Sequence, residues 1–194
     1  MNDDAWLNLL AELAVSTGPG RDPKHGHSFT HSLAASTTIA PHYGWLGEDL
    51  VKLLIIVGSV MGTSEGVAHF LARELTDKFQ PEVSLNADVN DLTRDPDELL
   101  LFCTSNTGCG DLPDNIMPLY LKLLSEPPNI AGRRYALINL GDSTYPTFGE
   151  AGMTLNAALE DIGAIPIAEP LVIDASVDRY PQKIALDWLR EILG

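Results

Sequence analysis

Cysteine is scarce in this chain, and no apolar run is long. Only Cys103 and Cys109 occur among 194 residues, and their spacing builds neither a disulfide framework nor a CxxC metal or redox pair. The longest strongly apolar run, residues 53–58, is far shorter than the ~20 residues that cross a bilayer. The acidic residues 1–4 are followed by no apolar core, which argues against a secretory signal peptide. These features predict a cytoplasmic protein that makes no use of a membrane.

Basic residues are also few. Twelve Lys and Arg face 27 Asp and Glu, which gives a formal net charge of −15. Such a surface repels nucleic acid and anionic lipid, so both are excluded as expected partners. Two interpretations of the acidity remain open: it steers the protein toward a basic partner protein, or it maintains solubility.

The first 50 residues differ in composition and in apolar pattern from the rest of the chain. The pattern of residues 6–15 predicts one short amphipathic helix. Residues 16–49 are rich in Gly, Pro, Ser, Thr and His, and their apolar residues show no sustained helical or strand periodicity. Four of the five histidines lie in this stretch, but no cysteine or regular histidine spacing supports a metal site. We expect residues 1–50 to be a flexible N-terminal extension, and residues 51–194 to form the folded domain.

From Leu53 onward the sequence alternates between short apolar runs and helical patterns. The apolar run at residues 53–57 is typical of a strand that is buried on both faces. We expect strands over residues 53–57, 82–86, 99–103, 135–140 and 165–173, and helices over residues 64–79, 113–125, 147–162 and 181–193. This alternation predicts an α/β fold with a parallel sheet and helices on both faces. Ligands of such sheets bind beyond the carboxyl ends of the strands, so the loops after the first, third and fourth strands are the candidate sites.

The loop after the first strand is short, rich in hydroxyl groups and followed directly by a helix. Its sequence, Gly58-Ser-Val-Met-Gly-Thr-Ser-Glu65, has no Gly-Lys-Ser/Thr of a Walker A loop, no GxGxxG and no GxSxG. Backbone N–H groups at a helix start form a natural phosphate site. The loop therefore predicts phosphate binding by neutral donors, with a helix start that binds nothing as the alternative.

Two further loops complete the pattern. After the third strand, Gly108 and Gly110 let the backbone approach a flat ligand closely. After the fourth strand, Tyr145 lies among small residues and suits stacking on a planar ring. Either loop alone also fits a simple turn, but three such loops in the expected order indicate one shared site.

These three loops resemble those of the flavodoxin family. The first is similar to the FMN-phosphate pattern Ser/Thr-x-Thr-Gly-x-Thr at Ser59, Gly62 and Ser64, and departs from it at Met61. The segment Gly108-Cys-Gly-Asp-Leu-Pro-Asp-Asn115 and the ending Leu171-Val-Ile-Asp-Ala-Ser176 are similar to short-chain bacterial flavodoxins of the MioC-like and YqcA-like types. The resemblance covers residues 51–194. It implies a three-layer sandwich with a five-stranded parallel sheet of order 2-1-3-4-5.

The resemblance also implies a cofactor, FMN, and the residues that hold it. Loop 59–64 would hold the phosphate, Tyr145 would stack on the outer face of the ring, and Gly108 would present a peptide carbonyl to it. Thr107 stands where many relatives have an inner aromatic ring. The FMN-binding residues implied are Ser59, Val60, Met61, Gly62, Thr63, Ser64, Thr104, Ser105, Asn106, Thr107, Gly108, Cys109, Gly141, Asp142, Tyr145, Phe148 and Gly149.

The function that this implies is electron transfer. We expect a monomeric, low-potential one-electron carrier between an NADPH-dependent flavodoxin reductase and an acceptor protein with a basic docking surface. No catalytic residue is predicted, because no nucleophile or acid/base pair lies beside the three loops, and no metal ligand is predicted. Two alternatives remain: a flavodoxin-like NAD(P)H:quinone reductase, and a regulatory or binding module that has no flavin.

Overall fold

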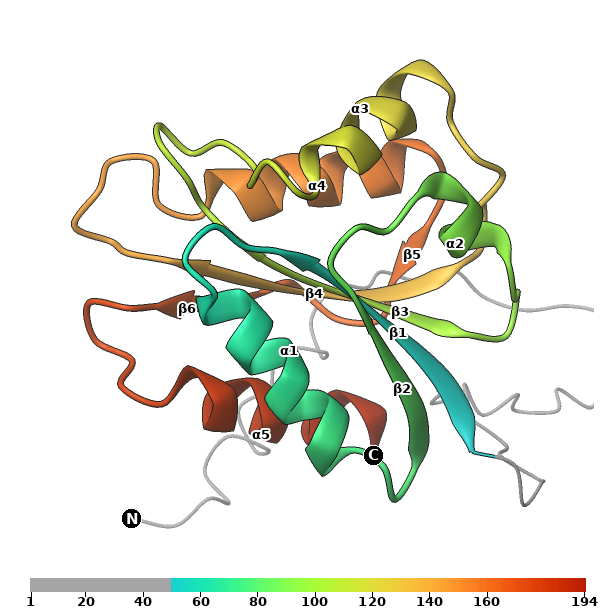
Figure 1. Ribbon diagram of the computed structural model, residues 1–194, viewed down its shortest axis with the longest axis horizontal. Helices are drawn as coiled ribbons and strands as arrows, with labels where there is room; N and C mark the ends of the chain where they lie inside the picture. Colours follow the sequence, from blue (N-terminus) through green and yellow to red (C-terminus); the bar gives the residue numbers. More distant parts are fainter. Residues whose placement is uncertain (1–49) are drawn as a thin grey trace, which may run out of the picture. The chain divides into compact units, whose positions relative to one another are not determined.

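A parallel β-sheet forms the centre of the computed structural model, which describes residues 50–194 (Figure 1). Its strand order is β2-β1-β3-β4-β5, and β6 also pairs with β4. The strands are β1 (Val51–Gly58), β2 (Phe79–Ser84), β3 (Leu99–Ser105), β4 (Arg134–Gly141), β5 (Ile165–Pro166) and β6 (Leu171–Asp174). The predicted α/β fold and the predicted order 2-1-3-4-5 are thereby confirmed. The expected helix over residues 6–15 and the histidines before residue 50 lie outside the described residues.

Helices cover both faces of this sheet. Figure 1 shows α1 and α5 on one face, and α3 and α4 on the other. The helices are α1 (Thr63–Glu74), α2 (Val89–Thr93), α3 (Met117–Ser125), α4 (Glu150–Asp161) and α5 (Pro181–Leu193). The strand pattern explains the two layers, because successive side chains of a strand point to opposite faces. Leu53, Ile55 and Val57 pack in the core under α1 and α5. Leu54 and Ile56 pack in the core under α3 and α4.

The expected fifth strand, residues 165–173, is divided in two. Tyr135 of β4 lies opposite Pro166, and Ile138 lies opposite Leu171. Residues 167–170 therefore lie opposite only residues 136 and 137, so the chain bulges between β5 and β6. Pro166 and Pro170 have no N–H to donate to a ladder, which accounts for the interruption.

Proline also shifts two other predicted boundaries. The sequence predicts a helix that ends just before Pro81, but α1 ends at Glu74, and Pro81 lies inside the edge strand β2, where proline is tolerated. The sequence also predicts that Pro118 disturbs the start of a helix over residues 113–125. The helix α3 begins instead at Met117, which places Pro118 in the first turn, where no intrahelical donor is lost.

The described residues contain neither a membrane-spanning helix nor a group of metal ligands. Between residues 50 and 194, no helix is long and apolar enough to cross a membrane. In the same range, no three His, Cys, Asp or Glu side chains are grouped to hold a metal ion.

Candidate functional site

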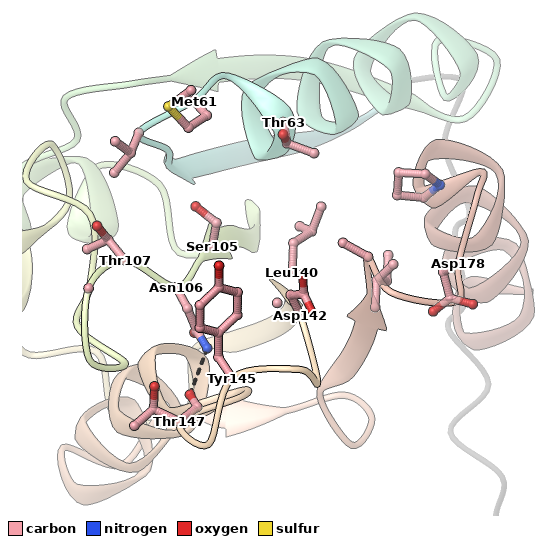
Figure 2. A pocket seen from close by; sticks show the side chains of 16 residues that line it. Met61, Thr63, Ser105, Asn106, Thr107, Leu140, Asp142, Tyr145, Thr147 and Asp178 are labelled. Carbon is pink, nitrogen blue, oxygen red and sulfur yellow. Dashed lines mark hydrogen bonds between the residues drawn. The ribbon is translucent and has the colours of Figure 1, made fainter.

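The predicted loops meet at the carboxyl edge of the sheet and enclose a cavity of about 540 Å³ (Figure 2). Figure 2 shows Met61 and Thr63 on one side of this cavity, Tyr145 opposite them, and Thr107 and Asp178 on either flank. The predicted residues that line it are Val60, Met61, Thr63, Ser105, Asn106, Thr107, Gly108, Gly141, Asp142 and Tyr145. A volume of this size is typical of sites for small molecules and cofactors.

Seven other predicted residues are not among those that line the cavity. They are Ser59, Gly62, Ser64, Thr104, Cys109, Phe148 and Gly149. The Phe148 ring lies where a side chain at Gly141 would stand, so it packs on the backbone of the third loop. Ser64 is fully buried, and its hydroxyl donates to the Gly58 carbonyl at 2.6 Å. The Ser64 hydroxyl of α1 is thus occupied by the end of β1.

The first loop, residues 59–62, leads into α1 without a side-chain cap. Gly62 is the N-cap residue at φ 83°, a left-handed conformation that favours glycine. Its N–H donates to the Ser59 hydroxyl oxygen at 3.0 Å, which leaves the Ser59 hydroxyl proton free to donate. The first N–H groups of a helix have no intrahelical acceptor, and they favour an anion. The geometry of this loop therefore suits a phosphate group.

The second loop, residues 106–111, is closed by its own backbone. Thr107 and Asp111 form a β-bridge, with the Thr107 N–H donating to the Asp111 carbonyl at 2.9 Å and the reverse bond also at 2.9 Å. Gly108 and Gly110 both have positive φ, 52° and 95°. A side chain at Gly110 would collide with Glu150 and Thr147, so this loop packs directly on the third loop.

Asparagine side chains hold the third loop, residues 141–149. The Asn106 amide donates to the Thr147 carbonyl at 3.0 Å and accepts from the Ala151 N–H at 3.2 Å. Asn139, on β4 and buried, donates to the Gly149 carbonyl at 2.7 Å. The loop that carries Tyr145 is thus fixed near its end, while the Tyr145 side chain itself remains 63% exposed.

A fourth segment lines the cavity, and sequence reasoning did not find it. It runs from the end of β6 to the start of α5 and contributes Ala175, Asp178 and Pro181. The remaining lining residues are Leu140 and Ile173, which lie on strands, and Thr147 of the third loop. Residues 171–176 resemble flavodoxins, but that likeness assigned no site residue there.

Asp174 joins the fourth segment to the third loop. Its Oδ1 accepts from the Ser143 N–H at 3.0 Å and from the Ser176 N–H at 2.9 Å. The Ser143 side chain and backbone, followed by Ser176, hold the pKa of Asp174 far below its ordinary value. Asp174 is therefore ionised wherever the protein is folded at moderate pH.

Carboxylates, and no basic side chains, line the cavity within the described residues. Asp142 and Asp178 are among the lining residues. Asp142 Oδ1 accepts from the Thr144 backbone and hydroxyl, at 2.9 and 2.6 Å. Any anionic group bound here must be held by backbone N–H and hydroxyl donors, as the first loop offers, and away from these carboxylates.

The fold and the cavity define the class of protein: a three-layer α/β protein with its candidate ligand site at the carboxyl edge of a parallel sheet. The family model for flavodoxin matches residues 55–187. A MioC homolog from Pasteurella multocida (strain Pm70) is 36% identical over 143 residues, which cover 74% of this chain and 97% of that protein. Flavodoxin YqcA from Escherichia coli (strain K12) is 34% identical over 146 residues, 73% of this chain and 96% of that protein.

A solved structure gives the same result. A cysteine-to-alanine mutant of a flavodoxin from Pseudomonas aeruginosa aligns with a TM-score of 0.67 at 34% identity, over 73% of this chain and 95% of that chain. This chain belongs to the flavodoxin family, so the resemblance drawn from its loops is confirmed. The family implies a bound FMN and an exchange of electrons with redox proteins.

Proposed function

We propose that this protein binds FMN without a covalent bond and acts as a low-potential one-electron carrier. The observation that carries the proposal is one cavity with two chemically different ends. An uncapped helix start lies beside the first loop, and an exposed aromatic side chain lies on the third loop. A phosphate and a planar ring, joined by a short polar chain, match these two ends.

The phosphate end uses neutral donors. The N–H groups at the start of α1 and the hydroxyl groups of Ser59 and Thr63 would hold the phosphate, and the α1 dipole favours its negative charge. The Ser64 hydroxyl is engaged by Gly58, so Ser64 would contribute its backbone alone. A terminal monophosphate fits this short loop better than the diphosphate of FAD.

The ring end combines an aromatic face with a flexible peptide. Tyr145 would stack on the isoalloxazine ring, which supplies the one-electron chemistry when FMN is bound. Gly108 would accept a hydrogen bond from the ring through its carbonyl. Asp142 and Asp178 line the same cavity, and their charges would oppose added negative charge on the ring, which lowers its potential.

Exposed side chains of the first and third loops support transfer to another protein. Val60, Met61 and Tyr145 line the cavity and are exposed by 54%, 89% and 63%. An exposed apolar rim on a protein of net charge −15 suits brief contact with a partner that carries basic residues. We propose an NADPH-dependent reductase as the donor and a redox protein as the acceptor.

The test follows electrons by anaerobic stopped-flow spectroscopy. The flavin absorbance of the purified protein should stay unchanged with NADPH or NADH alone. It should bleach when a catalytic amount of a bacterial NADPH-dependent flavodoxin reductase is added, and recover on addition of oxidised cytochrome c. The rate should fall as salt rises, because opposite charges steer the encounter. Rapid oxidation of NADPH by the protein alone, with quinone as acceptor, would contradict the carrier role.

A further inference from the structure

The Asn115 side chain joins three separate backbone segments at the edge of the site. Asn115 lies in the turn that leads from the second loop into α3, and its side chain is half-buried. Its Oδ1 accepts from the Ser59 N–H at 2.9 Å. Its Nδ2 donates to the Val57 carbonyl at 2.7 Å and to the Leu85 carbonyl at 2.8 Å. One amide is thereby bonded through both of its polar hydrogens and through its oxygen.

These three partners have one thing in common: each lies where a strand ends beside the first loop. Val57 is near the end of β1, Ser59 is the first residue of the loop, and Leu85 directly follows β2. A carboxamide offers two donors and an acceptor on one short planar group, and no other side chain of this size does. A carboxylate lacks both donors, and an aliphatic side chain lacks all three groups.

A chain of hydrogen bonds leads from Asn115 to the start of α1. Asn115 Oδ1 fixes the Ser59 N–H, and the Ser59 hydroxyl oxygen accepts from the N–H of Gly62. Gly62 is the N-cap residue of α1. The first loop exposes its central residues Val60 and Met61, so its conformation depends on bonds at its two ends.

We propose that Asn115 is a positioning residue for the phosphate end of the cavity. It acts through Ser59 and Gly62, and it sets the direction of the donors at the start of α1. This inference rests on the proposed FMN function. It adds that the turn directly after the second loop, which would contact the ring, also organises the first loop, which would contact the phosphate. The two ends of the site therefore form together.

A merely structural role would have a different signature. Loss of Asn115 would then weaken the whole domain, and it would lower the affinity for every flavin in equal measure. Riboflavin has the same ring as FMN and no phosphate. The ratio of the riboflavin dissociation constant to the FMN dissociation constant therefore reports on the phosphate end alone.

The experiment titrates the full-length apoprotein with FMN and with riboflavin, and follows the quenching of flavin fluorescence. In Asn115→Ala the FMN affinity should fall about tenfold, because one or two hydrogen bonds of ~1 kcal/mol each stop orienting the loop. The riboflavin affinity should change less than about twofold. The ratio of the two dissociation constants should accordingly fall about tenfold.

Asn156→Ala is the matched control. Asn156 is also a half-buried amide with two side-chain bonds, to the Tyr135 hydroxyl and to Glu160, but it lies on α4 and bonds to neither loop. Its replacement should lower stability and leave the ratio unchanged. Circular dichroism of each variant shows whether it is folded, and Asn115→Ser, with a shorter neutral polar side chain, is the second variant.

The outcomes separate the two claims. If the wild type binds neither flavin, the proposed function fails. If the wild type binds FMN but the variants keep its ratio, or lose both affinities equally, the positioning role of Asn115 is overturned. Failure of both Asn115 variants to fold would also overturn it, because the residue would then be required by the domain as a whole.

Discussion

At the scale of single residues, amide side chains connect the loops of this protein to its sheet and helices. Asn106 and Asn115 bond to the backbone of segments distant in the sequence, and Asn139 bonds to Gly149 across the third loop. Buried or half-buried backbone groups of loops must find partners, and an amide satisfies them without adding charge. None of these contacts follows from local sequence, because each depends on where the sheet brings the loops.

Gly152 illustrates how closely such an amide is packed. A Cβ atom at Gly152 would lie 2.3 Å from Cγ of Asn139, so Gly152→Ala forces the buried amide to move. We expect a loss of about 1–3 kcal/mol in the free energy of unfolding, measured by urea denaturation. Gly66→Ala is the matched control, because Gly66 lies in the exposed face of α1 with nothing near its Cβ position. It should gain roughly 0.5–1 kcal/mol. A Gly152→Ala protein as stable as the Gly66→Ala protein would contradict this packing.

Tyr145 provides the aromatic contact of the cavity. If FMN binds as proposed, Tyr145→Ala should weaken FMN binding by roughly tenfold, since an aromatic pair contributes ~0.5–1.5 kcal/mol beyond buried area. The second one-electron potential should rise, because the electron-rich phenol ring disfavours the anionic reduced flavin and its removal admits water. Fluorescence titration and a dye-coupled redox titration measure the two effects. Tyr145→Phe, which keeps the ring, should remain close to wild type. Unchanged affinity and unchanged potential in Tyr145→Ala would place Tyr145 away from the flavin.

At the scale of the elements, the sequence predicted the features that depend on apolar periodicity and on the order of the loops along the chain. The apolar run at residues 53–57 correctly assigned a strand buried on both faces, and the three loops were correctly expected at one edge. The boundaries that were wrong depend on proline and on tertiary pairing, as at Pro81 and Pro118. The cavity segment after β6 was missed although the predicted strand end, residue 173, lies one residue before the end of β6, because Ala175, Asp178 and Pro181 form no motif that marks a ligand site.

Asp174 makes the connection between β6, the third loop and the fourth segment dependent on pH. Its pKa is depressed in the folded state, so its ionised form stabilises the fold above the unfolded pKa of about 4. That contribution is lost as the pH falls from about 4 toward the lower folded value. Asp174→Asn should therefore be less stable than wild type at pH 5–7. This gap, the difference between the two free energies of unfolding, should narrow below about pH 4. Urea denaturation of both proteins at several pH values measures the gap. A gap that does not change with pH would mean that the charge of Asp174 is not what stabilises this connection.

At the scale of the whole molecule, the family match and the described cavity concern the chain after residue 50. The family match covers residues 55–187, and the residues of the described part that line the cavity lie between Val60 and Pro181. The first strand begins at Val51. The division into an extension of residues 1–50 and a domain of residues 51–194 stays a prediction.

A shortened protein tests that division. A protein that starts at Val51 should fold and bind FMN with the affinity of the full chain, within about twofold, because every proposed contact is retained. Circular dichroism and fluorescence titration of both proteins make the comparison. A shortened protein that folds but does not bind FMN would show that residues 1–50 contribute to the site.

The central claim is that this chain holds FMN, and the flavin released from the purified protein tests it most directly. The protein should be yellow, with the absorption spectrum of a bound flavin. After denaturation, chromatography of the released flavin against standards should show FMN. The apoprotein should recover the bound-flavin spectrum when FMN is added. It should not recover this spectrum when FAD is added instead. Release of FAD, or no flavin binding even after reconstitution with FMN, would contradict the account.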